Sequence, residues 1–217
     1  MNKLYLYFLF SLTLVNVTIA QQSNADSLIK LLPKINNDTV QIVVLNKIAM
    51  QLHNNQSVKS LNYAKKALEL AENTKQTKYL ILTYGTMAAT YWALSNYSEA
   101  LNYLFKKLKI LEKEKEHREL AKTYKHIALV LFSSEQDSLV MMYINKSIAI
   151  CEKYNFKTGI ADAYNLKANI KFHAGDTGNI EHLWIKSKEI YEQNNELLKA
   201  AAIEHNLGML FLKKTLS

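Results

Sequence analysis

The chain has 217 residues, a formal net charge of +8, 49% hydrophobic residues, 5 glycines, 1 proline and 1 cysteine. A single cysteine excludes an internal disulfide framework, and the scarcity of glycine and proline leaves few helix breakers. The excess of lysine can attract acidic partners or nucleic acid, but the lysines alternate with acidic residues, which is more typical of a solvated helical surface.

Residues 1–20 have the pattern of a signal peptide. Lys3 supplies the positive start, residues 4–14 form an apolar run, and Thr18 and Ala20 are small residues at the cleavage-site positions. The apolar run is too short to span a bilayer comfortably, and no cysteine follows it to carry a lipid anchor. The pattern therefore predicts an exported chain, periplasmic or secreted, without a stable membrane span after cleavage; an uncleaved anchor is the alternative.

Residues 21–38 form a lead-in to the main domain. The leucines of residues 26–32 share one face of a short helix, which Pro33 is expected to end. Asp38 or Thr39 is expected to cap the helix that follows, since both side chains can accept a hydrogen bond from a free backbone amide.

A helix–turn–helix pattern recurs from residue 39 onward. One small residue occurs in each copy at spacings of 39, 40, 40 and 40, and a second series recurs at spacings of 40. Fixed spacing of this kind is typical of repeat architectures. The first series comprises Ala49, Ala88, Ala128, Ala168 and Gly208, and the second Ser60, Ala100, Val140 and Ile180. Each first-series residue is expected where two helices touch.

The repeats define a domain over residues 39–217. In the first unit, Leu45, Ile48, Ala49 and Leu52 follow the i, i+3, i+4, i+7 spacing of one buried helical stripe. Tyrosines recur at the same 40-residue period and are expected to fill the flanks of each contact. The units are 39–73, 76–114, 116–154 and 158–194, with a half unit at 196–214.

These residues resemble the tetratricopeptide repeat family. The second unit carries Met87-Ala88, Tyr91, Tyr97 and Ala100-Leu101, and the half unit carries Asn206-Leu207-Gly208 and Phe211. The family period is about 34 residues, so this chain resembles the longer repeats of bacterial signalling proteins and kinesin light chains. The resemblance implies an all-α fold, a right-handed α-solenoid of antiparallel helix pairs with about four and a half repeats.

No pattern of catalytic or metal-binding chemistry stands out. The six histidines do not pair at metal-ligand spacing on one helix face, and the turn over residues 175–178 lacks the Lys-Ser/Thr of a phosphate loop. Cys151 lies among isoleucines, which favours a small core residue over a nucleophile. The sequence therefore predicts no enzyme, no metal and no cofactor.

The resemblance implies a concave face lined by the first helix of each pair. Positions carried over to that face include Leu129, Asp162, His173 and Met209. An extended peptide can be held there by aromatic, amide and cationic side chains. The residues selected for peptide binding are Trp92, Lys122, Lys125, Phe132, Asn165, Asn169, Phe172 and His205. The alternative for the aromatic residues among them is packing between neighbouring units.

These observations predict an exported, non-enzymatic scaffold that binds a protein or peptide in its concave groove. The alternative is the sensory input module of a truncated bacterial signalling protein, of the histidine kinase or helix-turn-helix regulator type. Nucleic-acid binding is not expected, because it requires a cytosolic protein with a continuous basic stripe. The helix of the half unit has no partner helix, which makes self-association a further possibility.

Overall fold

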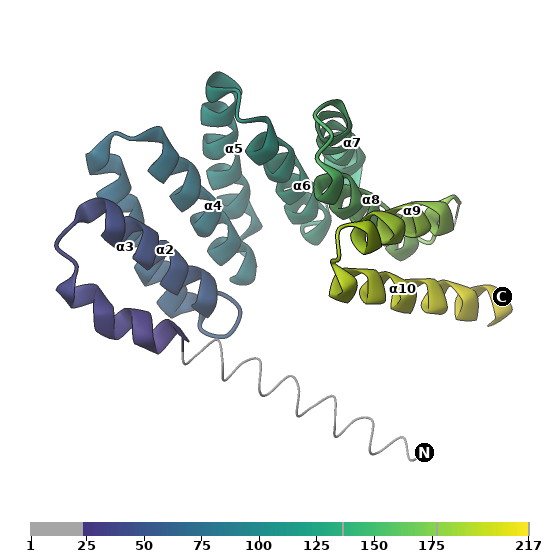
Figure 1. Cartoon of the computed structure of the whole chain (residues 1–217), viewed down its shortest axis with the longest axis horizontal. Helices are drawn as coiled ribbons and strands as arrows, with labels where there is room; N and C mark the ends of the chain where they lie inside the picture. Colours follow the sequence, from purple (N-terminus) through teal and green to yellow (C-terminus); the bar gives the residue numbers. More distant parts are fainter. Residues whose placement is uncertain (1–23, 136, 177, 217) are drawn as a thin grey trace, which may run out of the picture. The chain divides into compact units, whose positions relative to one another are not determined.

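The computed structural model describes residues 24–135, 137–176 and 178–216, so the predicted signal peptide lies outside the described part. All regular structure in these residues is helical (Figure 1). None of the described helices is long and apolar enough to cross a bilayer. The chain divides into two compact units, Met1–Lys107 and Leu108–Ser217.

The first unit consists of helix pairs that follow a helical lead-in at residues 24–31. Its elements are η1 (Leu32–Lys34, a 3₁₀ helix), α2 (Asp38–Leu52), α3 (Ser57–Thr74), α4 (Thr77–Ala93) and the beginning of α5 (Tyr97–Glu114). Short connections between contacting helices make neighbouring helices antiparallel, as predicted. Pro33 lies in η1, where the lead-in leaves α-helical geometry.

Small residues allow close helix contact in this unit. Ser60 on α3 donates a hydrogen bond to the backbone carbonyl of Ala49 on α2 at 2.8 Å, and its hydroxyl lies 2.9 Å from that of Thr90 on α4. Ala49 is fully buried together with Met87. The small residue thus lies where two helices touch, because a larger side chain would hold their backbones apart.

The second unit repeats the same arrangement. Its elements are the end of α5, then α6 (His117–Ser133), α7 (Asp137–Lys153), α8 (Lys157–His173), α9 (Ile180–Gln193) and α10 (Leu197–Leu216), with α6 packed on α7, α8 on α9 and α9 on α10 (Figure 1). We call α2, α4, α6, α8 and α10 the first helices and the others the second helices. The connection from α8 to α9 is the longest in this unit.

One hydrogen bond recurs in both complete pairs of the second unit. Ser147 on α7 donates to the carbonyl of Ala121 on α6 at 2.8 Å, and Ser187 on α9 donates to that of Ala161 on α8 at 2.8 Å. All four residues are buried, and the two bonds are 40 residues apart in sequence. A buried hydroxyl needs such a partner, so this bond fixes how each second helix meets its first helix.

The ends of the helices repeat as regularly as their contacts. A residue with positive φ follows a helix at intervals of 20 residues, and Gly175 is the one glycine in the series. At several of these ends the amide just beyond that residue bonds a carbonyl five residues back, as Asn96 does to Tyr91, which is the Schellman motif. The series is Lys75, Ser95, Lys115, Glu135, Asn155, Gly175 and Asn195.

Two sequence-based expectations about local structure are wrong. Asn37, and not Asp38 or Thr39, caps α2: its side chain accepts from the amide of Val40 at 3.0 Å, and Asp38 is already the first helical residue. Gly208 does not lie at a helix contact. A Cβ built on Gly208 would meet nothing within 4 Å, so no described residue packs against this position.

The uncovered side of α10 matches buried positions in the preceding first helices. Ala161, Tyr164 and Ala168 on α8 are 0%, 8% and 0% exposed where they face α9. The equivalent positions on α10 are all exposed, and Phe211 is 67% exposed. We call these residues, Ala201, Glu204, Gly208 and Phe211, the open face of α10.

Candidate functional site

Most of the predicted site residues lie on α6, α8 and α10 of the second unit. Trp92 is on α4 of the first unit, where it is half-buried. The remainder are spread over first helices that contact one another or share hydrogen bonds. The predicted residues of α6, α8 and α10 therefore form one connected part of the predicted face, within the second unit.

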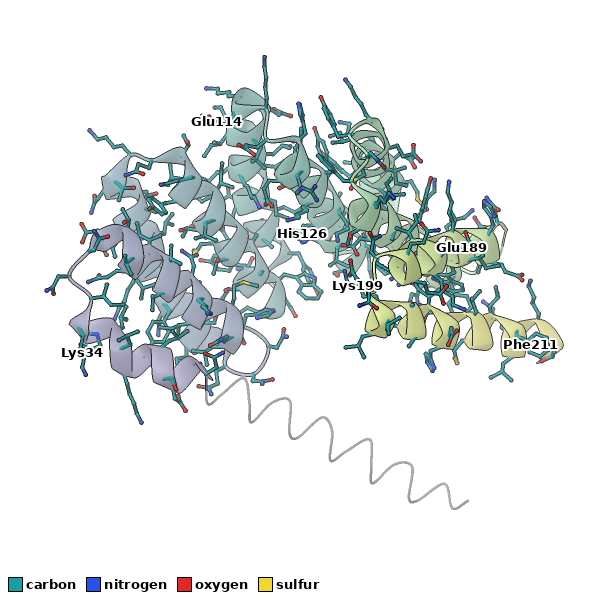
Figure 2. The ribbon with its side chains drawn as sticks, in the orientation of Figure 1. Lys34, Glu114, His126, Glu189, Lys199 and Phe211 are labelled. Carbon is teal, nitrogen blue, oxygen red and sulfur yellow. The ribbon has the colours of Figure 1, made fainter. Side chains whose placement is uncertain are left out.

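Asp162 joins three helices of this site. Its carboxylate accepts from Lys125 of α6 at 2.6 Å, from the Tyr191 hydroxyl of α9 at 2.7 Å and from Lys199 of α10 at 3.2 Å. Figure 2 labels Lys199 near the start of α10. Burial alone would raise the pKa of the Asp162 carboxyl, but the Lys125 ammonium and the hydrogen bonds outweigh it and lower that pKa.

The Asp162 network continues along the first turns of α8 and α10. Lys199 also pairs with Glu196 at 2.7 Å, and Thr158 of α8 donates to Glu196 at 2.9 Å. Burial and the Asp162 carboxylate raise the pKa of the Tyr191 hydroxyl. These contacts fix α8 relative to its neighbours and hold one wall of a pocket in place.

The pocket has a volume of about 270 Å³ and combines charged, polar and apolar groups. Close contact between α7 and α8 forms its floor: a Cβ built on Gly159 would lie 2.7 Å from Sγ of Cys151. Burial raises the pKa of the Cys151 thiol, consistent with the structural role predicted for it. The lining residues are Arg118, Lys122, Lys125, Ser147, Cys151, Phe156, Thr158, Gly159 and Asp162.

A stack of planar side chains positions Arg118 at this pocket. The guanidinium carbon lies 4.3 Å from the centre of the Phe156 ring. Phe156 stacks on Tyr154 at 5.8 Å, and Tyr154 stacks on His117 at 4.1 Å. Within the described residues Arg118 makes no hydrogen bond or ion pair, so its N–H groups remain available at the pocket.

The other two cations of the pocket have acidic partners. Lys122 pairs with Glu119 at 2.8 Å on the solvent side of α6, and its side chain is 51% exposed. Lys125 pairs with Asp162, and its side chain is 21% exposed. Both were predicted as site residues, and the structure brings them together in one pocket with Arg118.

The two predicted asparagines lie farther along α8. The carbonyl oxygen of Asn169 accepts from Trp184 Nε1 at 2.9 Å and from Asn206 Nδ2 at 3.2 Å, so Asn169 joins α8 to α9 and α10. Asn165 lies one turn before it, and its Oδ1 is buried without a hydrogen-bond partner in the described part of the chain. Neither residue lines the pocket.

Two of the predicted aromatic residues, Phe132 and Phe172, contact neighbouring helices. Phe132 of α6 lies 6.1 Å from His173 of α8, measured between ring centres. Phe172 lies 5.6 Å from Trp184 of α9, and Lys213 of α10 is 4.9 Å from the Phe172 ring centre. These contacts correspond to the packing alternative, whereas His205 on α10 is exposed and available to a ligand.

Three solved structures share the arrangement of helices described above. Aspartyl phosphate phosphatase F from Bacillus subtilis matches with a TM-score of 0.73 at 18% identity, over 85% of this chain and 52% of that chain. A Rap protein complexed with competence and sporulation factor has a TM-score of 0.73 at 19% identity, over 88% and 54%. The apo form of RapI has a TM-score of 0.70 at 15% identity, over 95% and 77%.

The fold is an all-α helical repeat. The match to these three structures confirms the predicted all-α class. At identities of 15–19% the match shows a shared fold and nothing more. The chain spans about half the length of the first two structures that it matches. No protein-family model and no curated protein matches the chain, so membership of the tetratricopeptide family itself stays a prediction.

Sequence reasoning missed part of the pocket of this helical repeat. It did not select Arg118, Phe156 or Thr158, because these residues lie in the first turns of α6 and α8 or just before them, outside the middle of each helix. One signal was present: Arg118 is the only arginine in a chain with 27 basic residues. The described residues contain no cluster of three His, Cys, Asp or Glu side chains that could hold a metal ion.

Proposed function

We propose that this chain is a non-enzymatic scaffold that binds a protein or peptide along the first helices of its second unit. The observation that carries the proposal is the pocket at Arg118, Lys122 and Lys125. It is large enough for a side chain, and its lining combines apolar surface with charged groups. Sites of this composition orient a ligand by a few polar groups while apolar contacts supply affinity.

The shared fold supports a binding role. One of the three matching structures is a Rap protein complexed with competence and sporulation factor. This fold therefore occurs in a complex with such a factor, and stacked helix pairs present extended surfaces that suit protein or peptide partners. Another match is named a phosphatase, which makes a direct activity assay with a phosphoprotein a worthwhile companion to any binding experiment.

An array of immobilised peptides of random sequence tests the proposal. The labelled full chain is compared with Lys122→Glu, which reverses a charge at the pocket but leaves the Lys125–Asp162 pair intact. Lys113→Glu is the matched control, because Lys113 is an exposed lysine at the end of α5 and lies outside the pocket. We expect Lys122→Glu to weaken most bound peptides about tenfold and the control to leave them unchanged.

Two results would contradict this proposal. The first is that the native chain binds no peptide on the array. The second is that Lys122→Glu and Lys113→Glu weaken the same peptides equally, because binding would then follow the net charge of the chain and not the pocket.

The second candidate function is the sensory input module of a bacterial signalling protein, exported as residues 1–20 indicate. The observation that favours it is that the fold recurs in a structure complexed with competence and sporulation factor. The genomic sequence directly downstream tests it. A continuous reading frame for a kinase or helix-turn-helix domain supports the module, and a stop codon followed by an unrelated gene contradicts it.

A further inference from the structure

Arg118 is the one cation lining the pocket that has no acidic partner among the described residues. Lys122 has Glu119 and Lys125 has Asp162. We propose that Arg118 binds a carboxylate of the bound peptide. This inference rests on the proposed peptide-binding function and specifies the chemical group that the pocket recognises.

The position of the guanidinium suits this ligand. A guanidinium stacked on a ring is held by its face, while its N–H groups point outward in the plane and match the two oxygens of a carboxylate. The stack of Phe156, Tyr154 and His117 restricts Arg118 before any ligand arrives. Less side-chain freedom is then lost on binding, which favours affinity.

The balance of charge in the pocket favours a single negative charge. Arg118, Lys122 and Lys125 carry three positive charges, and Glu119 and Asp162 offset two of them. One carboxylate neutralises the remainder, whereas a phosphoryl group near pH 7 carries about two negative charges and would leave an excess. The first turn of α8 also lines the pocket through Thr158 and Gly159, and a helix N-terminus adds a positive field of its own.

The pocket accommodates the stem of an acidic side chain as well as its charge. Phe156 and the buried Cys151 supply apolar surface, and the floor is tight because Gly159 allows α8 to approach Cys151. The methylene groups of an aspartate or glutamate can lie against this floor while the carboxylate reaches Arg118. A C-terminal carboxylate offers the same charged group, so the experiment must separate these two sources.

The test uses peptides that the full chain retains on the random array, resynthesised in three matched forms. The first keeps its Asp and Glu residues and has an amidated C-terminus. The second replaces them by Asn and Gln and stays amidated, and the third has the same replacements with a free C-terminus. Affinities are measured in solution for the native chain, Arg118→Gln, Arg118→Lys and the control Lys113→Gln.

We expect the replacement of acidic residues to weaken binding to the native chain about tenfold. The same replacement should have little effect on Arg118→Gln, because the carboxylate and the guanidinium act as a pair. Arg118→Lys should recover part of the affinity, since it keeps the charge but loses the planar fork. Recovery by a free C-terminus would assign the carboxylate to the chain end, and no recovery would assign it to a side chain.

Three outcomes would overturn the inference. Peptides that bind the native chain equally well with and without acidic residues would exclude carboxylate recognition while leaving the scaffold function intact. An equal loss in the native chain and in Arg118→Gln would place the carboxylate elsewhere. If no peptide binds the native chain, the scaffold function fails and the inference fails with it.

Discussion

A single side chain, Asp162, holds together the helices of the candidate site, whether or not it contacts a ligand itself. Its carboxylate accepts from α6, α9 and α10, and the lysines on either side of it are each 37 residues away in sequence. The partial burial that would disfavour a charge here is offset by two ammonium groups and a hydroxyl. A substitution of Asp162 should therefore lower the free energy of unfolding more than it changes the affinity for a ligand.

Asp162→Asn tests that role through its pH dependence. Because the folded pKa of Asp162 lies below its unfolded value of about 3.9, the ionised carboxylate stabilises the fold above that pH and the contribution is lost as pH falls through the folded pKa. We expect the variant to lose about 1–3 kcal/mol of unfolding free energy at pH 7. Urea denaturation at pH 7 and near pH 3 measures the difference.

The difference in stability between Asp162→Asn and the native chain should narrow at the lower pH. Below about pH 3.9 the unfolded native chain takes up a proton at Asp162, so the stabilisation by the charge falls as the pH approaches the folded pKa. Glu114→Gln, which changes an exposed carboxylate at the end of α5, should match the native chain at both values. A gap that stays constant with pH would show that the amide fails for steric reasons and that the carboxylate charge does not matter.

The pocket illustrates what a single sequence does not reveal at this scale. Lys122 and Lys125 could be placed on a shared face by carrying over positions from the tetratricopeptide family that the chain resembles. Arg118 could not, because its position depends on rings from the α7–α8 connection that no helical periodicity predicts. Contacts between a helix and a distant turn require the tertiary structure.

Helices α3 to α9 end in left-handed residues that are mostly not glycine. A residue other than glycine, asparagine or aspartate loses about 1–2 kcal/mol in that conformation, relative to a right-handed one. Lys115 and Glu135 adopt it with φ of 56° and 58°, and Gly175 does so with φ of 78°. At other ends of this series, such as that of α4, the Schellman bond from Asn96 to Tyr91 helps to compensate for such strain.

Substitutions at these ends should change stability in opposite directions. Lys115→Gly removes the strain and should raise the free energy of unfolding by about 1 kcal/mol, whereas Gly175→Ala introduces it and should lower that free energy by a similar amount. The midpoint of urea denaturation, at an unchanged slope, measures both. Asn155→Gly is the control and should gain less, because asparagine tolerates this conformation. If Lys115→Gly lost stability, the left-handed assignment would be wrong.

At the level of elements, the sequence predicted helix contacts correctly where a residue pattern recurs. The 40-residue spacing of small residues placed α2 and α3, α6 and α7, and α8 and α9 against each other because close packing requires a small residue at the same position each time. The sequence did not identify the N-cap of α2. Three polar residues in a row can each accept a hydrogen bond there, and in the structure Asn37 is the one that does so. Competing caps differ by fractions of a kcal/mol, which a single sequence does not resolve.

At the scale of the whole molecule, the open face of α10 stays exposed in the described part of the chain. The residues of this face are spaced three, four and three apart, so they are symmetric about residue 206. We propose that a second copy of the chain covers it. In an antiparallel pair of two α10 helices, Phe211 of each copy meets Ala201 of the other, which places a large side chain on a small one. Figure 2 labels Phe211 toward the end of α10.

If two copies associate in this way, the average molecular mass of the protein in solution should rise with its concentration. Light scattering on the purified full chain should show dimers at high concentration, and Phe211→Glu should shift the population to monomers by placing a charge in the contact. Met209→Glu is the control, since Met209 is also an exposed apolar residue of α10 but lies outside the open face. A chain that stays monomeric at all concentrations, or equal effects of both variants, would contradict the proposal.

The regular interval between left-handed residues also bears on how such a chain can change over generations. A stretch bounded by two of them 40 residues apart, such as residues 116–155, contains one first helix, one second helix and both of their endings. If the corresponding DNA were copied in tandem, each copy would arrive with its serine, its alanine and its tyrosine already in register with its neighbours. Recombination could therefore lengthen or shorten the array by whole pairs, while the few residues at a pocket diverged independently in each copy.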